Sequence, residues 1–181
     1  VFECRAEHLV KDDAGRVVGV TGVSTADGTP YTVSANKGVI IASGGFSANV
    51  EMRQEYDEIW GNLTEAVPTT NAPTITGDGI VMAKEVGAAL TGMDKIQIHP
   101  HGNPKTGALQ SHFAGSVTNS IYVNKEGHRF TEETGRRDTI SNDTLQQTDH
   151  IMFSIYDART ASDNSDNAVE MGNAYKADTL E

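Results

Sequence analysis

The sequence is poor in cysteine, in long apolar runs and in positive charge. Cys4 is the single cysteine among 181 residues, which excludes an internal disulfide and a metal site built from several thiolates. No apolar stretch approaches the roughly 18 residues that a membrane-spanning helix needs. With 14 Lys and Arg against 25 Asp and Glu, the net charge is −11, so polyanions would be repelled. We therefore expect no nucleic-acid partner and no membrane span.

The composition is nevertheless that of a folded protein. Hydrophobic residues make up 37% of the chain and charged residues 22%, which provides enough apolar material for a core. A length of 181 residues suits one ordinary domain or two small lobes. The chain begins inside a strand-like run at Val1 and stops at Glu181, just after residues typical of a helix start. We expect it to be an internal piece of a longer polypeptide.

The first third of the sequence is rich in strand signals. Apolar runs separated by Asp- and Gly-containing turns at 12–15 and 27–28 predict an antiparallel meander over residues 1–34. Residues 38–42 form an unbroken apolar run, typical of a strand buried on both faces in a parallel sheet.

The rest of the chain alternates between helix and strand signals. Asn49 is a candidate N-cap and Gly87 a candidate C-cap. The other predicted elements are helices over about 50–60, 80–86 and 139–147, strands over 96–99 and 151–156, a hairpin over 121–130, and polar loops over 61–76 and 161–168. The fold class expected from this order is α+β.

Two glycine-containing turns are candidates for binding an anionic cofactor. Residues 43–46 follow the apolar run, at the kind of position where α/β sheets bind cofactors, although a plain strand-to-helix turn has the same residues. Residues 76–79 precede a predicted helix, whose N-terminus favours anions; Asp78 could equally serve only to stabilise the helix dipole. The complete Gly-x-Gly-x-x-Gly fingerprint is absent.

Histidines and arginines in the second half allow further alternatives. His99, His101 and His112 could form a three-histidine zinc site, but no thiolate supports a metal, and we expect none. A histidine after an apolar segment is either a satisfied core residue or a hydrogen-bond donor to a substrate. Arg136 and Arg137 form either an exposed turn or a carboxylate-binding site.

Six sequence blocks in a fixed order resemble one known family. They are Gly-Val-Ile-Ile-Ala-Ser-Gly-Gly-Phe (38–46), Thr-Gly-Asp-Gly-Ile-Val-Met-Ala (76–83), Gly-Ala-Ala-Leu (87–90), Gln-Ile-His-Pro (97–100), Ile-Tyr-Val-Asn-Lys-Glu-Gly-His-Arg-Phe (121–130) and Arg-Arg-Asp (136–138). Over most of residues 1–158 the chain resembles the flavoprotein of the fumarate reductase and succinate dehydrogenase family. It is most similar to soluble flavocytochrome c type fumarate reductases and to relatives that reduce urocanate or other enoates.

The resemblance implies a domain division, a cofactor and site residues. Residues 1–96 would be the C-terminal part of a Rossmann-like FAD-binding domain, and 97–181 the N-terminal part of an α+β capping domain. FAD contacts are implied at Ala6, Ala42, Ser43, Gly44, Gly45, Phe46, Thr76, Gly77 and Asp78. In this family a hydride passes from flavin N5 to one alkene carbon of an α,β-unsaturated carboxylate. Arg137 would protonate the other carbon, and His99, with Gln97 as its neighbour, would hold the carboxylate.

The chain departs from the fumarate reductase pattern at residues 111–116. The stretch Ser111, His112, Phe113 replaces the threonine–glutamate pair, and the relay arginine of the family is also absent. We therefore expect a substrate other than fumarate, with Ser111, His112 and Phe113 beside it and an apolar substituent near Phe113. Two alternatives stay open: a noncatalytic folded fragment, and an interaction domain without bound flavin. The sequence does not identify the electron donor.

Overall fold

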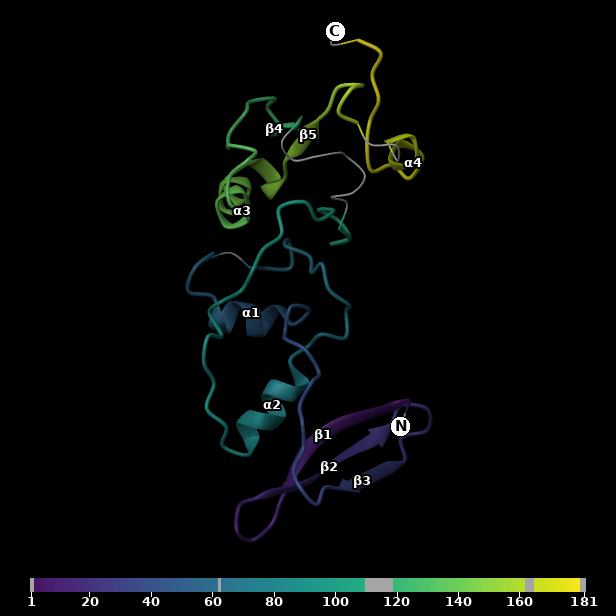
Figure 1. The fold of residues 1–181 in the computed structure, drawn as a ribbon, viewed down its shortest axis with the longest axis vertical. Coiled ribbons are helices and arrows are strands. Elements are labelled where there is room, and N and C mark those ends of the chain that lie inside the picture. Colours follow the sequence, from purple (N-terminus) through teal and green to yellow (C-terminus); the bar gives the residue numbers. More distant parts are fainter. Residues whose placement is uncertain (1, 62, 110–118, 162–164, 180–181) are drawn as a thin grey trace. The chain divides into compact units, whose positions relative to one another are not determined.

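The computed structural model describes residues 2–61, 63–109, 119–161 and 165–179. The chain divides into two compact units (Figure 1). Unit 1 comprises Val1–Thr64 and Asn71–Lys95, and unit 2 comprises Glu65–Thr70 and Ile96–Glu181. Helices and strands occur in both, so the mixed helix and strand content expected from the sequence is present. None of the helices in the described part of the chain is long and apolar enough to cross a membrane.

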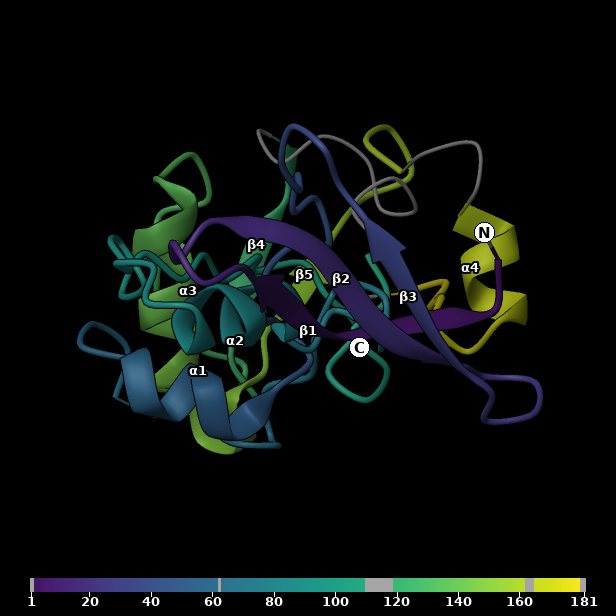
Figure 2. The same cartoon turned by 90° about the horizontal axis from the view of Figure 1, so that it is seen from below.

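Unit 1 begins with the expected antiparallel meander. Strands β1 (Cys4–Lys11), β2 (Val17–Ser24) and β3 (Pro30–Ser34) form a three-stranded sheet in the order β1-β2-β3, which Figure 2 shows as adjacent twisted ribbons. Asp12 stabilises the first turn, because its Oδ1 accepts backbone N–H bonds from Ala14 at 3.1 Å and from Arg16 at 2.8 Å. The meander is confirmed.

Two helices follow in unit 1, α1 (Val50–Tyr56) and α2 (Asp78–Glu85). Asn49 caps α1 as expected, accepting from the Met52 N–H. Gly87 ends α2 at φ +92°, and the N–H groups of Gly87 and Ala88 donate to the carbonyls of Lys84 and Ala83, each at 3.0 Å. This is a Schellman motif. Helix α2 packs against β1.

The apolar run at residues 38–42 does not form the expected buried strand. It has no regular secondary structure, and no strand among residues 2–61, 63–109, 119–161 and 165–179 forms a ladder with it. Ile40 is 93% exposed and Ile41 42% exposed. Hydrophobicity indicates a tendency to be buried, whereas a strand also needs a neighbour for its N–H and C=O groups. The run therefore gives no evidence of a Rossmann-like sheet.

Unit 2 is built around a small sheet and a helix. Strand β4 (Ile121–Val123) pairs antiparallel with β5 (Phe153–Ile155), and helix α3 (Arg137–Leu145) precedes a short 3₁₀ helix, η2 (Thr148–His150). Tyr122 on β4 is completely buried. The turn expected at 124–127 is present, because the Gly127 N–H donates to the Asn124 carbonyl at 3.0 Å.

Three expectations for unit 2 are corrected. The hairpin over 121–130 is reduced to one bridge between Val123 and Arg129, and the ladder of β4 is formed with β5 on its other edge. Residues 96–99 form no strand. The polar segment 161–168, expected to be a loop, overlaps helix α4 (Ser165–Glu170), in which Ala168 is buried. Composition alone predicted a loop there because five of those six residues are polar or small.

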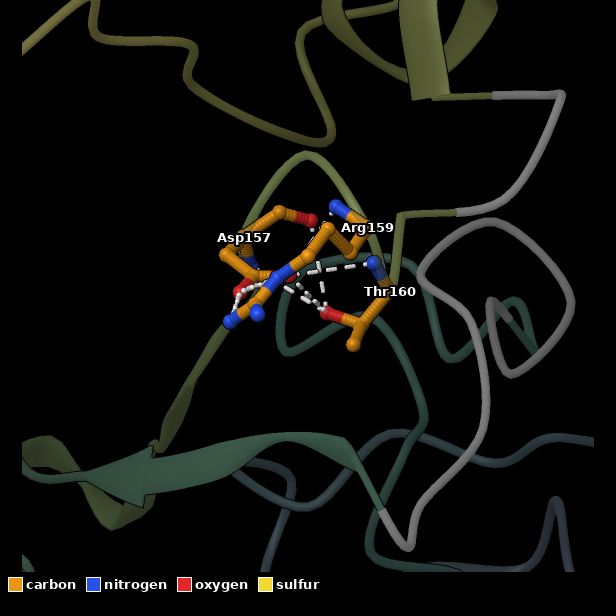
Figure 3. A network of polar contacts seen from close by, with 3 residues as sticks. All are labelled: Asp157, Arg159 and Thr160. Carbon is orange, nitrogen blue, oxygen red and sulfur yellow. Dashed lines mark hydrogen bonds and ion pairs between the residues drawn. The ribbon is translucent and has the colours of Figure 1, made fainter.

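A self-contained turn follows β5 (Figure 3). Asp157 Oδ1 accepts the backbone N–H groups of Arg159 at 3.0 Å and Thr160 at 3.1 Å, while the Arg159 guanidinium donates to Oδ2 at 2.6 and 3.0 Å. All of these bonds lie within four consecutive residues and are exposed. These bonds fix the turn that follows β5. Because they are exposed, they contribute little to the free energy of unfolding.

Candidate functional site

The two glycine-containing turns, 43–46 and 76–79, are separated in sequence but lie against each other in unit 1. A Cβ added to Gly79 would lie 2.2 Å from Ser43 Oγ, and one added to Gly77 would lie 3.1 Å from Phe46 Cβ. Gly44 faces the Ile75 side chain, with 3.3 Å between its Cβ position and Ile75 Cδ1. The side chains of 41–46 therefore pack on the first turn of α2 only because glycine stands at 77 and 79.

Hydrogen bonds fix this arrangement. The Ala48 N–H donates to the Ile75 carbonyl at 2.9 Å, and Asn49 Nδ2 donates to the Thr76 carbonyl at 3.0 Å. Thr76 Oγ1 donates to Asp78 Oδ1 at 2.7 Å. Arg5, next to Ala6 on β1, forms an ion pair with Asp78 at 3.5 Å. Segments 43–46 and 76–78 thus meet near the N-terminus of α2, and β1 contacts the same point through Arg5.

The residues present fit a large phosphorylated cofactor such as FAD. Gly44 adopts φ +84°, and a Cβ at Gly45 would meet nothing within 4 Å, so open backbone is exposed there. Because glycine has no side chain, a ligand can approach the backbone N–H groups of this turn closely. The N-terminal N–H groups of α2 favour a negative charge. Ala42, also implied as a cofactor residue, is exposed beside this turn.

In unit 2, helix α3 carries Arg137 as its first residue and is tied to the segment that carries His99. Ser141 Oγ on α3 donates to the Ile98 carbonyl at 3.2 Å, and Ser141 and Ile140 are buried. The Arg137 guanidinium, which is exposed, lies close enough to act electrostatically on His99 and His101. The structure thus brings together the two residues expected to carry catalysis, while Gln97 is exposed.

The pKa values of His99 and His101 are both lowered, which favours the neutral imidazole at neutral pH. Burial, followed by the positive charge of Arg137, lowers the pKa of His99. Burial, then the charges of His99 and Arg137, lowers the pKa of His101. The backbone N–H of His101 donates to His99 Nδ1 at 3.3 Å, so a neutral His99 carries its proton on Nε2. His99 is therefore a hydrogen-bond donor next to a guanidinium, a combination suited to a carboxylate.

The sequence reasoning missed Tyr122 and the position of His101. His101 Nε2 lies 2.7 Å from Tyr122 Oη. The Tyr122 N–H donates to Glu133 Oε1 at 2.9 Å, and Arg129 donates to both oxygens of that carboxylate at 2.9 and 2.6 Å. A tyrosine in an apolar strand is a signal for such a contact, because a buried hydroxyl needs a hydrogen-bond partner.

Ser111, His112 and Phe113 lie outside the described residues, as does the third histidine of the zinc alternative. Among the residues that the structure does describe, no group of three or more His, Cys, Asp or Glu could hold a metal ion.

Comparison with known proteins identifies relatives of the whole chain. Residues 1–163 match a family model described as an FAD binding domain. NADH:acrylate oxidoreductase of Vibrio harveyi is 38% identical over 188 residues, covering 100% of this chain and 18% of that protein. Urocanate reductase of Eggerthella lenta is 40% identical over 178 residues, covering 94% of this chain and 28% of that protein.

A solved structure from a fumarate reductase is similar to this chain in fold. The open conformation of a flavocytochrome c3 fumarate reductase matches with a TM-score of 0.71 and 33% identity, over 86% of this chain and 26% of that one. The chain thus spans 18% to 28% of the length of these two curated relatives.

Proposed function

Because the chain belongs to the family of FAD-binding domains, we propose that it forms part of an FAD-dependent oxidoreductase that reduces the double bond of an α,β-unsaturated carboxylate. The observation that supports this most directly is the cluster of neutral His99 and cationic Arg137, tied together through Ser141 and Ile98. The named activities of its relatives, on acrylate and urocanate, are of the same chemical class.

Two domains have separate roles in this proposal. Residues 1–96 are the later part of a Rossmann-like FAD domain, with 43–46 and 76–78 along the cofactor. Residues 97–181 begin the capping domain and supply the substrate contacts. Bound FAD supplies the hydride for the alkene carbon farther from the substrate carboxylate. The residues of this chain bind the carboxylate, exclude water and deliver the proton.

His99 and Arg137 have separate roles. His99 donates its Nε2–H to the substrate carboxylate, a role for which the neutral tautomer set by the His101 N–H is suited. Arg137 stabilises the negative charge that develops on the carbon next to the carboxylate and gives that carbon a proton, completing the saturated product. A guanidinium holds its proton tightly in water, so the transfer requires a closed site from which water is excluded.

The proposed substrate is a monocarboxylate rather than fumarate. Residues 111–116 contain Phe113 and Ser116 where fumarate reductases place charged groups. A second carboxylate there would lose its hydration without gaining a cation. Phe113 favours an apolar or aromatic substituent instead.

Steady-state kinetics on the complete polypeptide test this proposal. With a reduced viologen as donor, acrylate, urocanate or cinnamate should give a higher kcat/KM than fumarate. Arg137→Ala should abolish turnover with flavin still bound, and Arg137→Lys should restore little, because an ammonium differs from guanidinium in geometry and donors. Arg136→Ala, which removes the adjacent arginine, is the matched control. Highest kcat/KM on fumarate, or turnover by Arg137→Ala, contradicts the proposal.

A second candidate is a folded piece with no activity of its own, favoured by the small share of its relatives that the chain spans. The net charge of −11 opposes binding of a diphosphate. Equilibrium dialysis of the 181-residue chain against FAD separates the cases: stoichiometric binding at submicromolar FAD supports a cofactor site complete in this chain.

A further inference from the structure

The turn at residues 99–101 fixes one edge of the His99 ring. The His101 N–H points at His99 Nδ1 with a separation of 3.3 Å, so this nitrogen must present a lone pair. Either tautomer of a neutral imidazole is otherwise accessible. The geometry of the turn therefore decides which edge of His99 carries the proton.

The side chain of His101 anchors that turn to β4. Its Nε2 lies 2.7 Å from Tyr122 Oη, and the two rings meet edge to face with centroids 5.6 Å apart. The His99 and His101 rings meet in the same way, also at 5.6 Å. One continuous set of contacts thus runs from the Tyr122 phenol to the His99 ring.

Tyr122 is a rigid anchor. It is completely buried, its strand pairs with β5, and its N–H is held by the Glu133 carboxylate at 2.9 Å. The Arg129 guanidinium holds that carboxylate on its other side. The anchor is therefore set by β4 and by Glu133, independently of any ligand.

Burial and the charges around His101 favour the neutral forms of both His101 and Tyr122. His99 and Arg137 face His101 and lower its pKa together with burial. Burial is the largest effect on Tyr122 and raises its pKa. A hydrogen bond with Ser120 lowers this pKa, and the charges of Tyr156 and Glu133 raise it. The contact between His101 and Tyr122 is thus a hydrogen bond between neutral groups.

We propose that His101 and Tyr122 are positioning residues that act through His99, holding it in the tautomer with its proton on Nε2. The role of that proton, donation to the substrate carboxylate, rests on the proposed function; the tautomer itself does not. A buried tyrosine–histidine bond with a purely structural role would stabilise unit 2 without changing the proton position on His99.

Nitrogen NMR of the histidine rings tests the tautomer. In the 15N-histidine-labelled chain, two-bond proton–nitrogen correlations identify the protonated nitrogen of each of the six histidines, and His99→Gln assigns His99. The expected result is an Nε2–H tautomer in the wild type and a mixture in Tyr122→Phe. Tyr31→Phe, half-buried on β3 of unit 1, is the matched control and should leave His99 unchanged.

Two results overturn the proposal: an Nδ1-protonated His99 in the wild type, or an unchanged tautomer in a folded Tyr122→Phe. If Tyr122→Phe does not fold, His101→Phe provides the same test, since it keeps the backbone N–H and a ring but loses Nε2. An unchanged tautomer in that variant also overturns the proposal.

A double-mutant cycle in the complete polypeptide tests the link to activity. Tyr122→Phe should lower kcat/KM on the best enoate about tenfold, through KM rather than kcat, because a carboxylate contact is made in the ground and transition states alike. In a His99→Ala background, Tyr122→Phe should have no further effect. A further tenfold loss there means that Tyr122 does not act through His99. Absence of turnover on every enoate contradicts the proposed function, and the NMR result still decides the positioning role.

Discussion

Asn49 Nδ2 donates a hydrogen bond of 3.0 Å to the carbonyl of Thr76, 27 residues farther along the chain. The other atom of the same amide, Oδ1, accepts the Met52 N–H at 3.0 Å and caps α1. One side chain therefore caps α1 and joins the start of that helix to the glycine-containing turn at 76–79.

Asn49→Ala should lower the free energy of unfolding by about 2 kcal/mol, because a helix cap and a second hydrogen bond are lost together. Urea unfolding followed by circular dichroism measures this. Asn36→Ala is the control: Asn36 is exposed and its backbone carbonyl, which accepts from Arg16, is retained. Equal losses in the two variants mean that the Asn49 amide does not join the start of α1 to the turn at 76–79.

Gly77→Ala should destabilise the chain by about 3 kcal/mol, through an unfavourable backbone and a steric clash. Gly77 has φ +89°, and its new Cβ would lie 2.5 Å from Met52 Sδ. Gly28→Ala at φ +75° meets no atom within 4 Å and isolates the backbone cost, about 1 kcal/mol. Thermal or urea unfolding of both variants gives the difference, and a Gly77→Ala loss no larger than that of Gly28→Ala contradicts the packing described.

Arg137→Gln should raise the pKa of His99 and of His101. A nearby cation disfavours imidazolium, so removing it makes both rings easier to protonate. Histidine NMR titrations of the chain measure the midpoints, and Arg137→Lys should largely preserve the wild-type values. Arg136→Gln is the matched control, because Arg136 pairs with Asp138 at 3.1 Å. Unchanged midpoints in Arg137→Gln place the guanidinium away from the histidines.

Glu133 should make unit 2 sensitive to acid. Hydrogen bonds from Arg129, and then from the Tyr122 N–H, lower the pKa of Glu133 from 4.5 to about 2. A carboxyl group with a lowered pKa stabilises the folded state at pH values above its ordinary pKa of 4.5. This contribution is lost as the pH falls from there through about 2. A pKa lowered from 4.5 to about 2 corresponds to about 3 kcal/mol of folded-state stability.

Urea unfolding of the chain at several pH values between 2 and 5 measures this loss. Glu133→Gln should flatten the dependence over that range and lower stability at neutral pH. Glu132→Gln, which changes an exposed neighbour, should follow the wild-type curve. A wild-type-like pH dependence in Glu133→Gln would falsify the assigned ionisation.

Local signals in the sequence predicted the local structure well. The turn at 12–15 is formed by hydrogen bonds within it, and Asn49 and Gly87 mark helix ends through their own side-chain and backbone chemistry. Such features need few distant residues. The bounds of α1 are shorter than the expected 50–60 because Asp57 binds the N–H groups of Ile59 and Trp60 and starts a separate turn.

Pairing between distant segments was not predictable in the same way. Strand β4 selects β5 rather than the nearby residues after its turn, and residues 38–42 have no ladder partner in the described part of the chain. Hydrophobicity gives no information on which segments pair. For the site, the family resemblance supplied His99 and Arg137, whose catalytic roles stay predictions. Tyr122 was missed because in sequence it is one more apolar residue of a strand.

Residues 65–70 belong to unit 2, although the stretches on both sides of them belong to unit 1. A Cβ at Gly107 would lie 1.8 Å from the Thr69 carbonyl oxygen, so the backbones of these two segments are in direct contact. Unit 2 is thus encoded by two separate stretches of sequence. A chimera that exchanges the second half of the chain between two relatives at a single crossover near residue 96 would combine one parent's 65–70 with the other's 102–107 loop. A compatible exchange must transfer both stretches together.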